Sequence, residues 1–278
     1  MKKVFHPYIL IGGGVSLLLI LAAVAAPFLS PYPPDEINLR GRFLPPSWEH
    51  WFGTDEVGRD VFSRVLYGIR ISLGIGVTTR TAGLWIGILV GCLSGYYGGK
   101  IDAVLQRLVD ITMAFPFLLL VIAIAVTLRE GLLSVFVALS LVMWAGMARL
   151  MRSQVMVVKE SEYVHAARAF GASDLRIMAR HILPNSYVPA LIWWTMGLAQ
   201  ATMAEAGLSF LGLGAQPPTP SWGSMINYGS QALRVAPWIS LFPGAALAVT
   251  VLGFNLLGEG LRDILDPHYH RYPVAGSS

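Results

Sequence analysis

The sequence predicts an all-α membrane protein with six transmembrane helices. Of its 278 residues, 55% are hydrophobic and 13% are charged, and the mean hydropathy is +0.60. Soluble domains carry about 25% charged residues, so this composition excludes a soluble enzyme, a disordered regulator and a secreted disulfide scaffold. Six stretches reach the roughly 20 apolar residues that cross the hydrocarbon core of a bilayer. They are Tyr8–Leu29, Ser72–Tyr96, Ile111–Leu128, Leu132–Met151, Tyr187–Leu208 and Trp238–Leu257.

The first span and the distribution of basic residues predict the topology. Tyr8–Leu29 follows Lys2 and Lys3, as in a signal peptide, but its apolar run is longer than the roughly 7–15 residues of a signal h-region. We therefore expect it to remain as a span. With the N-terminus inside, Lys and Arg are more numerous in the inner connections than in the outer ones. Because basic residues favour the cytoplasmic side, we expect a multi-pass protein of the plasma membrane with both termini in the cytoplasm.

The connection after the first span is too long to be a simple turn. Its part 53–72 is predicted to form an interfacial helix with Thr54 as the N-cap and an apolar stripe of Val57, Val61, Val65 and Ile69. This helix is either a gate or a contact for a binding protein, or it is an elbow that packs on the membrane surface and orients the second span, and we favour the elbow. The chain then divides into residues 1–71, with the first span, the outer loop and the interfacial helix, and residues 72–278, with a five-helix core.

The inner connection 152–186 carries the most informative pattern. Helix-forming residues run to Phe170, Gly171 breaks the helix, and Ser173 caps a second helix that Pro184 ends. A face of small residues on the first helix allows another backbone to come close. The connection is either a docking surface for a partner or an amphipathic segment that lies on lipid headgroups.

The sequence His165-Ala166-Ala167, followed by Gly171 and by Leu183-Pro184, resembles the "EAA" loop of bacterial ABC-importer permeases. Two positions depart from that pattern, since a histidine replaces the family's Glu at 165 and another replaces its Ile at 181. The resemblance implies a coupling helix that lies in a groove of an ATPase subunit. The coupling residues that it implies are His165, Ala166, Ala167, Gly171, Ala172, Asp174, Leu183 and Pro184.

Four further segments resemble the shorter, C-type permease of dipeptide, oligopeptide and nickel importers, which implies the type I ABC-importer permease fold. They lie after the first span, at the end of the second span, at the outer end of the fifth span and near the C-terminus. They are Phe52–Arg64, Gly95–Asp102, Glu205–Gly214 with the following Pro217–Gly223, and Leu261–Pro267.

Two charged residues lie within spans, where ionisable groups are costly and often functional. Arg80 either contacts a substrate carboxylate or snorkels to the outer surface. Glu205 either contacts the substrate or anchors the structure. A glycine-rich segment follows Glu205, and we expect it to line the translocation path or an outer gate. The candidates for this path are Arg80, Glu205, Ser209, Gly212 and Gly214. Tryptophans near the span ends, Trp193 and Trp222 among them, are expected in interfacial belts.

The chain has no Gly-x-x-x-x-Gly-Lys-Ser/Thr phosphate loop, so we expect a non-catalytic subunit that binds no cofactor or metal. The resemblance implies a second permease subunit, two ATP-binding subunits that use ATP and Mg, and an extracytoplasmic solute-binding protein. We expect contact with membrane lipid and not with nucleic acid, because no Lys/Arg run is present. Di- or oligopeptides are the favoured cargo. Nickel or a metal chelate is the alternative, and a self-sufficient secondary transporter is the alternative outside this class.

Overall fold

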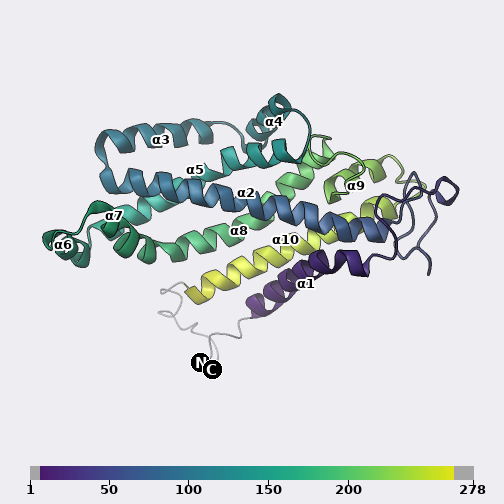
Figure 1. Cartoon of the computed structure of the whole chain (residues 1–278), viewed down its shortest axis with the longest axis horizontal. Coiled ribbons are helices and arrows are strands. Elements are labelled where there is room, and N and C mark those ends of the chain that lie inside the picture. The colour runs from purple at the N-terminus through teal and green to yellow at the C-terminus, as the bar shows by residue number, and fades with distance from the viewer. Residues whose placement is uncertain (1–6, 266–278) are drawn as a thin grey trace, which may run out of the picture.

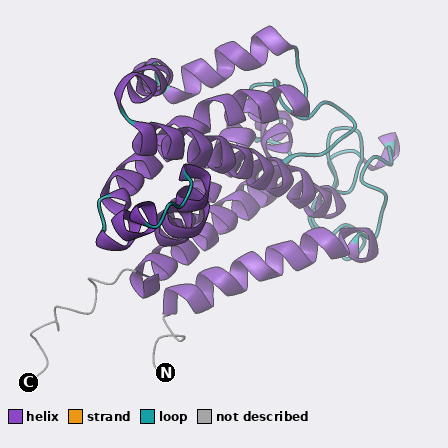
Figure 2. Cartoon of the chain, turned by 60° about the vertical axis from the view of Figure 1, so that its left-hand side comes forward, coloured by secondary structure: helices purple, strands orange, loops and turns teal. Residues whose placement is uncertain are grey.

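The computed structural model describes residues 7–265, and that part of the chain is built from helices and their connections (Figures 1 and 2). The predicted all-α class is confirmed. The long helices lie side by side along the longest axis of Figure 1, with α6 and α7 at one end and α9 at the other, here called the α6 end and the α9 end. The α-helices are α1 (Pro7–Leu29), α2 (Val61–Tyr97), α3 (Gly99–Ala114), α4 (Phe117–Leu128), α5 (Leu132–Lys159), α6 (Glu162–Ala169), α7 (Asp174–Ile177), α8 (Leu183–Phe210), α9 (Trp222–Ser230) and α10 (Trp238–Leu265).

Four helices in the described part, α1, α2, α5 and α10, are long and apolar enough to cross a membrane. Helices α3 and α4 reach that length only as a bent pair, which would give five spans. Helix α8 is 28 residues long but is less apolar, since it carries Asn185, Gln200 and Glu205. The predicted number of six spans is therefore not confirmed, although every predicted stretch is helical over most of its length.

The prediction that the third span, Ile111–Leu128, is one continuous helix is wrong. Helix α3 ends at Ala114, and α4 begins at Phe117 after a bend of 93°. Pro116 explains the break, because proline lacks an amide hydrogen and disfavours helical backbone at the preceding residue, Phe115. With 12 residues, α4 is about 18 Å long, too short to cross a hydrocarbon core of about 30 Å.

Helices α2 and α5 pack closely along a stripe of glycines. Gly83, Gly87, Gly91 and Gly95 recur every fourth residue of α2 and face α5. A Cβ atom at Gly91 would lie 2.6 Å from the carbonyl oxygen of Ala148, on α5. Small residues at such spacing let helix backbones approach closely, as in membrane helix pairs. This seam, which we call the α2–α5 seam, holds the centre of the fold together.

The predicted interfacial helix over 53–72 differs from the structure. Helix α2 begins at Val61 and continues without a break to Tyr97. Asp60, and not Thr54, caps its start, since the Asp60 carboxylate accepts a hydrogen bond from the backbone N–H of Ser63 at 2.8 Å. Thr54 is instead buried in the preceding turn, where its hydroxyl donates to the Gly41 carbonyl at 2.5 Å. A charged cap next to the helix dipole replaces the predicted hydroxyl cap.

The sequence predicts that Pro184 ends the second helix of the 152–186 connection. In the structure the helical backbone continues past Pro184. Helix α7 passes through the π-helical turn η2 (Met178–Ile182) directly into α8, and Pro184 lies in the first turn of α8. A proline is tolerated at that position because the first N–H groups of an α-helix have no α-helical acceptor. Gly171 does interrupt the helix, with φ at +81°, a conformation that favours glycine.

Candidate functional site

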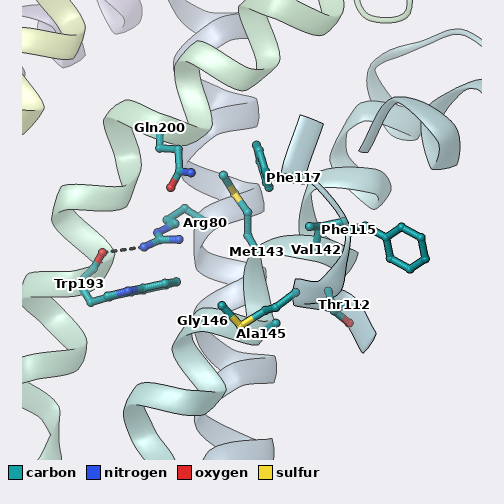
Figure 3. Close-up of a pocket in the computed structure, with 11 residues that line it drawn as sticks. Arg80, Thr112, Phe115, Phe117, Val142, Met143, Ala145, Gly146, Trp193 and Gln200 are labelled. Atoms are coloured by element: carbon teal, nitrogen blue, oxygen red, sulfur yellow. Dashed lines mark hydrogen bonds between the residues drawn. The ribbon is translucent and has the colours of Figure 1, made fainter. Parts of the chain in front are cut away.

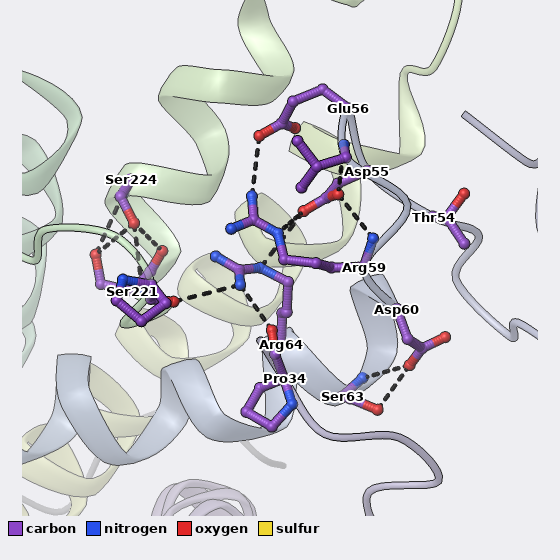
Figure 4. A network of polar contacts seen from close by, with 12 residues as sticks. Pro34, Thr54, Asp55, Glu56, Arg59, Asp60, Ser63, Arg64, Ser221 and Ser224 are labelled. Atoms are coloured by element: carbon purple, nitrogen blue, oxygen red, sulfur yellow. Dashed lines mark hydrogen bonds and ion pairs between the residues drawn. The ribbon is translucent and has the colours of Figure 1, made fainter. Parts of the chain in front are cut away.

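A buried network of charges holds the α9 end together (Figure 4). The Asp55 carboxylate lies 2.6 Å from Nε of Arg59 and 3.7 Å from Nε of Arg64. Arg64 also donates to the carbonyls of Pro34 and Pro218, at 2.7 and 3.4 Å. Asp55, Arg59 and Arg64 are all buried. The network therefore joins the connection after α1, the start of α2 and the connection after α8.

At the opposite end, residues 160–182 form a compact projection, which we call the α6–α7 segment (Figure 1). Three of its apolar side chains, Val164, Ile177 and Ile182, are fully buried in a cluster with α2 and α5. The hydroxyl of Tyr96, at the end of α2, donates to the Asp174 carboxylate at 2.6 Å. These contacts fix the segment on the ends of two long helices.

The outer face of the α6–α7 segment is apolar and has no partner within the described part of the chain. Phe170 is 92% exposed and Leu175 is 74% exposed. Ala166 and Gly171 are also exposed, whereas Ala167 is half-buried and packs toward the cluster. His165 is exposed as well, and its Nε2 lies 3.6 Å from the Glu160 carboxylate. Of the other predicted coupling residues, Ala172 and Leu183 are half-buried and Pro184 is exposed.

A cavity of about 330 Å³ opens between α2, α5, α8 and the bend between α3 and α4 (Figure 3). A second hollow of about 460 Å³ adjoins α4, α8 and α10, and Phe117 and Gln200 line both. Five of the α8 residues at these hollows lie three or four positions apart, so they share one helix face. These five are Trp193, Met196, Gln200, Met203 and Gly207, and Ala199 and Ala204 also line the second hollow.

Arg80 lies at the wall of the first cavity, in the middle of α2. Its side chain is buried, and Nη2 donates to the Trp193 carbonyl at 2.7 Å (Figure 3). The predicted alternative of snorkelling to the outer surface is therefore wrong. Trp193 also departs from its predicted place in an interfacial belt, since its ring lies beneath the Arg80 guanidinium, and Trp222 is fully buried.

Glu205 and Ser209 form a separate buried group near the end of α8. The Ser209 hydroxyl donates to Glu205 Oε1 at 2.7 Å and accepts from the backbone N–H of Ala215 at 3.3 Å. Gly214 is packed against Ser209, and Gly212 forms the exposed turn after α8 with φ at +82°. Neither Glu205 nor Ser209 lines the two hollows described above. The structure thus places Arg80 apart from the other four path candidates.

We expect Glu205→Gln to retain at least half of the wild-type transport activity, because glutamine keeps an acceptor for the Ser209 hydroxyl. Glu205→Ala should lower the free energy of unfolding by about 1–3 kcal/mol, since it leaves a buried hydroxyl without its partner. Uptake rates and thermal unfolding of the two variants check this. A tenfold or greater loss of uptake in Glu205→Gln would instead indicate that the carboxylate contacts the substrate.

Sequence reasoning missed most residues that line the cavity. Phe117, Met143 and Gln200 come from three helices that are distant in sequence, so no local pattern brings them together. One signal was available. Gln200 is a polar residue in an apolar span and lies seven positions after Trp193, on the same helix face.

Comparison with known proteins gives two family matches. The family described as "Binding-protein-dependent transport system inner membrane component" matches residues 87–271. The family described as "N-terminal TM domain of oligopeptide transport permease C" matches residues 5–46. Together the two matches cover both ends of the described chain.

Similar proteins align with nearly the whole chain. The dipeptide transport system permease protein DppC of Alkalihalophilus pseudofirmus is 45% identical, over 89% of this chain and 82% of its own length. The oligopeptide transport system permease protein OppC of Bacillus subtilis is 42% identical, over 93% of this chain and 85% of its own length. The glutathione transport system permease protein GsiD of Pectobacterium atrosepticum is 41% identical, over 96% of this chain and 89% of its own length.

A solved structure supports the fold. The inward-facing MetNI methionine ABC transporter contains a chain that matches with a TM-score of 0.59 at 20% identity, over 73% of this chain and 96% of that one. The predicted resemblance is confirmed by the family matches and the relatives together. The chain belongs to the family of binding-protein-dependent transport system inner membrane components, and it is a non-catalytic, multi-pass permease subunit of an ABC importer.

Proposed function

We propose that this chain forms one half of the translocation pathway of an ATP-driven peptide importer. A second permease subunit encloses the other half, two ATP-binding subunits use ATP and Mg, and an extracytoplasmic solute-binding protein delivers the ligand. The apolar hollows along α8 support this proposal, because they lie at the surface of the described part, where a second chain can close them. Alternating access then follows from a two-state movement that nucleotide binding biases.

The cargo that we propose is a di- or oligopeptide. The observation that carries this choice is the 41–45% identity, over most of the chain, to permeases named for dipeptides, oligopeptides and glutathione. Uptake of a labelled dipeptide and of labelled nickel is compared in cells that lack this chain and in cells where it is restored. Chain-dependent uptake of the peptide supports the proposal, and chain-dependent uptake of nickel alone contradicts it.

The α6–α7 segment is the proposed coupling element. The exposed side chains of Phe170 and Leu175, next to the small residues Ala166 and Gly171, offer an apolar surface for a groove of the ATPase subunit. The buried anchors and the Tyr96–Asp174 hydrogen bond hold this surface rigidly on α2 and α5. A displacement imposed by the ATPase subunit therefore reaches the long helices.

We expect Gly171→Asp to abolish uptake and to prevent copurification of the ATP-binding subunits, while the chain still inserts into the membrane. The matched control is Gly171→Asn, which has the same size and tolerates the positive φ equally well but adds no charge. It should retain part of the uptake and of the copurification. Wild-type uptake and copurification in Gly171→Asp would refute the coupling role.

The topology that we propose places the α6 end, with the start of α1 and the end of α10, in the cytoplasm of the bacterial cell (Figure 1). Lys2, Lys3 and the C-terminal tail from residue 266 lie outside the described residues. The two family matches, to 5–46 and 87–271, support the proposed division into 1–71 and 72–278, although α2 runs through its boundary. Cysteine accessibility at Ala166 and at Trp48, which are both exposed, tests the sidedness.

A further inference from the structure

An arginine without an acidic partner lies at the wall of the 330 Å³ cavity (Figure 3). Arg80 is 3% exposed, and no acidic side chain among residues 7–265 forms an ion pair with it. Nη2 has the Trp193 carbonyl as its acceptor, while Nε has no hydrogen-bond partner in the described part. A buried cation without an anion is costly. The fold therefore holds a guanidinium that one anionic group would satisfy.

Two residues of α8 fix the position of this guanidinium. Its central carbon lies 3.3 Å from the centroid of the Trp193 ring, a cation–π contact. Gly197 lies directly against the guanidinium, and any side chain at that position would overlap it. The absence of a side chain at residue 197 therefore makes the space that Arg80 occupies. Because the group is already oriented, little freedom is lost when an anion binds.

The rest of the cavity wall is mainly apolar. Met113, Phe115, Phe117 and Met143 line it, and Gln200 adds one amide group. The volume of about 330 Å³ lies at the lower end of the ~300–1,000 Å³ of small-molecule sites. A guanidinium presents its N–H groups in a planar fork that matches a carboxylate. The wall thus suits a small ligand in which a carboxylate adjoins an apolar group.

We propose that Arg80 binds the carboxylate of the transported ligand, while Phe117 and Met143 contact the apolar group beside it. This assignment rests on the proposed import of peptides and deepens it. The carboxylate is the C-terminus of a short peptide, and the apolar group is its last side chain. An acidic side chain of the second permease subunit would offer the same chemistry, so the experiment must separate the two sources.

The experiment uses the complete importer, purified with its second permease and ATP-binding subunits but without the solute-binding protein, whose own selectivity would mask the effect. Binding of the dipeptide Ala-Phe is compared with binding of its C-terminal amide. Tryptophan fluorescence reports on the site through Trp193. We expect the free acid to bind wild type at least about tenfold more tightly than the amide, the ratio typical of a hydrogen bond to a charged group.

Three variants test the residue itself. Arg80→Gln should bind the acid and the amide equally, Arg80→Lys should keep part of the preference, and Gly197→Ala should reduce it by displacing the guanidinium. The matched control is Arg149→Gln, because Arg149 is an exposed arginine that pairs with Asp110 outside the cavity. It should keep the wild-type preference.

Three results would overturn the proposal: equal binding of acid and amide by wild type, an unchanged preference in Arg80→Gln, or loss of the second permease subunit from the Arg80→Gln complex. The last result would assign the missing anion to the partner.

ATP-driven uptake of Ala-Phe, measured with the solute-binding protein present, separates this proposal from the proposed function. Uptake without an acid preference refutes only the Arg80 site. Acid-selective binding without uptake refutes peptide import and leaves the carboxylate site standing.

Discussion

Gly91→Leu is expected to destabilise the permease strongly, because it forces the α2–α5 seam apart. A Cβ atom at this position would lie 2.6 Å from the Ala148 carbonyl oxygen, 2.6 Å from Cβ of Met151 and 2.9 Å from the backbone nitrogen of Arg152. Two of these atoms are backbone atoms of α5, which cannot rotate away. Overpacking of a closed core typically costs about 1–3 kcal/mol per substitution, and sometimes more. We expect the leucine variant at the upper end of that range and Gly91→Ala at the lower end.

The measurement is thermal unfolding in detergent, together with the amount of chain recovered from the membrane. Gly74 provides the matched control, because it lies on the same helix, is exposed, and has no neighbouring atom within 4 Å of the place where a Cβ atom would lie. Alanine is the better helix former by about 1 kcal/mol, so Gly74→Ala should be neutral or stabilising. If Gly91→Ala and Gly74→Ala unfold at the same temperature, the seam does not depend on the absence of a side chain at Gly91.

Asp55→Asn should destabilise the α9 end by about 3–5 kcal/mol, since it leaves two buried arginines without their shared carboxylate. The carboxylate of Asp55 interacts with Arg59 and Arg64, and its other oxygen accepts from the backbone N–H groups of Val57 and Arg59, at 3.0 and 2.9 Å. Asparagine can keep some of these acceptor contacts but removes the negative charge. The expected result is faster proteolysis of the connection between α1 and α2, together with a lower unfolding temperature.

Glu56 offers a control within the same network. Its carboxylate pairs with Nη2 of Arg59 at 3.0 Å, but its side chain is 31% exposed. An ion pair in contact with water contributes only about 0–1 kcal/mol, so Glu56→Gln should leave the proteolysis rate nearly unchanged. Equal effects of Asp55→Asn and Glu56→Gln would show that burial of the charges does not determine their importance.

Local patterns predict the fold class and the positions of most helices. The apolar stretches of α1, α5 and α10 are continuous in sequence, and a bilayer selects such stretches by composition alone. The bend at Pro116 is also visible as a proline, but hydropathy alone joins the apolar residues on both sides into one span. In that case the backbone restriction of proline outweighs continuity of hydropathy.

The helix ends are harder to predict than the helices. Thr54 and Asp60 are both acceptable N-cap residues for a helix. Which of them caps α2 depends on the hydrogen bond from the Thr54 hydroxyl to the carbonyl of Gly41, which is 13 residues away. Pro184 is a frequent stop signal, yet here the π-helical turn before it carries the chain from α7 into α8. Neither outcome can be decided from the nearby sequence.

The two candidate sites also differ in how far the sequence alone predicts them. The α6–α7 segment is one continuous stretch with a glycine break, so its pattern and its resemblance are visible directly in the sequence. The contact between Arg80 and Trp193 joins residues that are 113 positions apart. A single sequence places each of them in a span but contains no information about the pair. This is why composition alone places Trp193 at the membrane interface.

The uninterrupted course of α2 has a mechanical consequence. With 37 residues it is a rod about 55 Å long, longer than the hydrocarbon core of about 30 Å. The Asp55 network holds one end of this helix in place, and the hydrogen bond between Tyr96 and Asp174 holds the other end. If such a rod pivots near one end by about 5°, its far end moves by about 5 Å. Small rotations at the α6 end therefore become displacements at the α9 end as large as one turn of a helix.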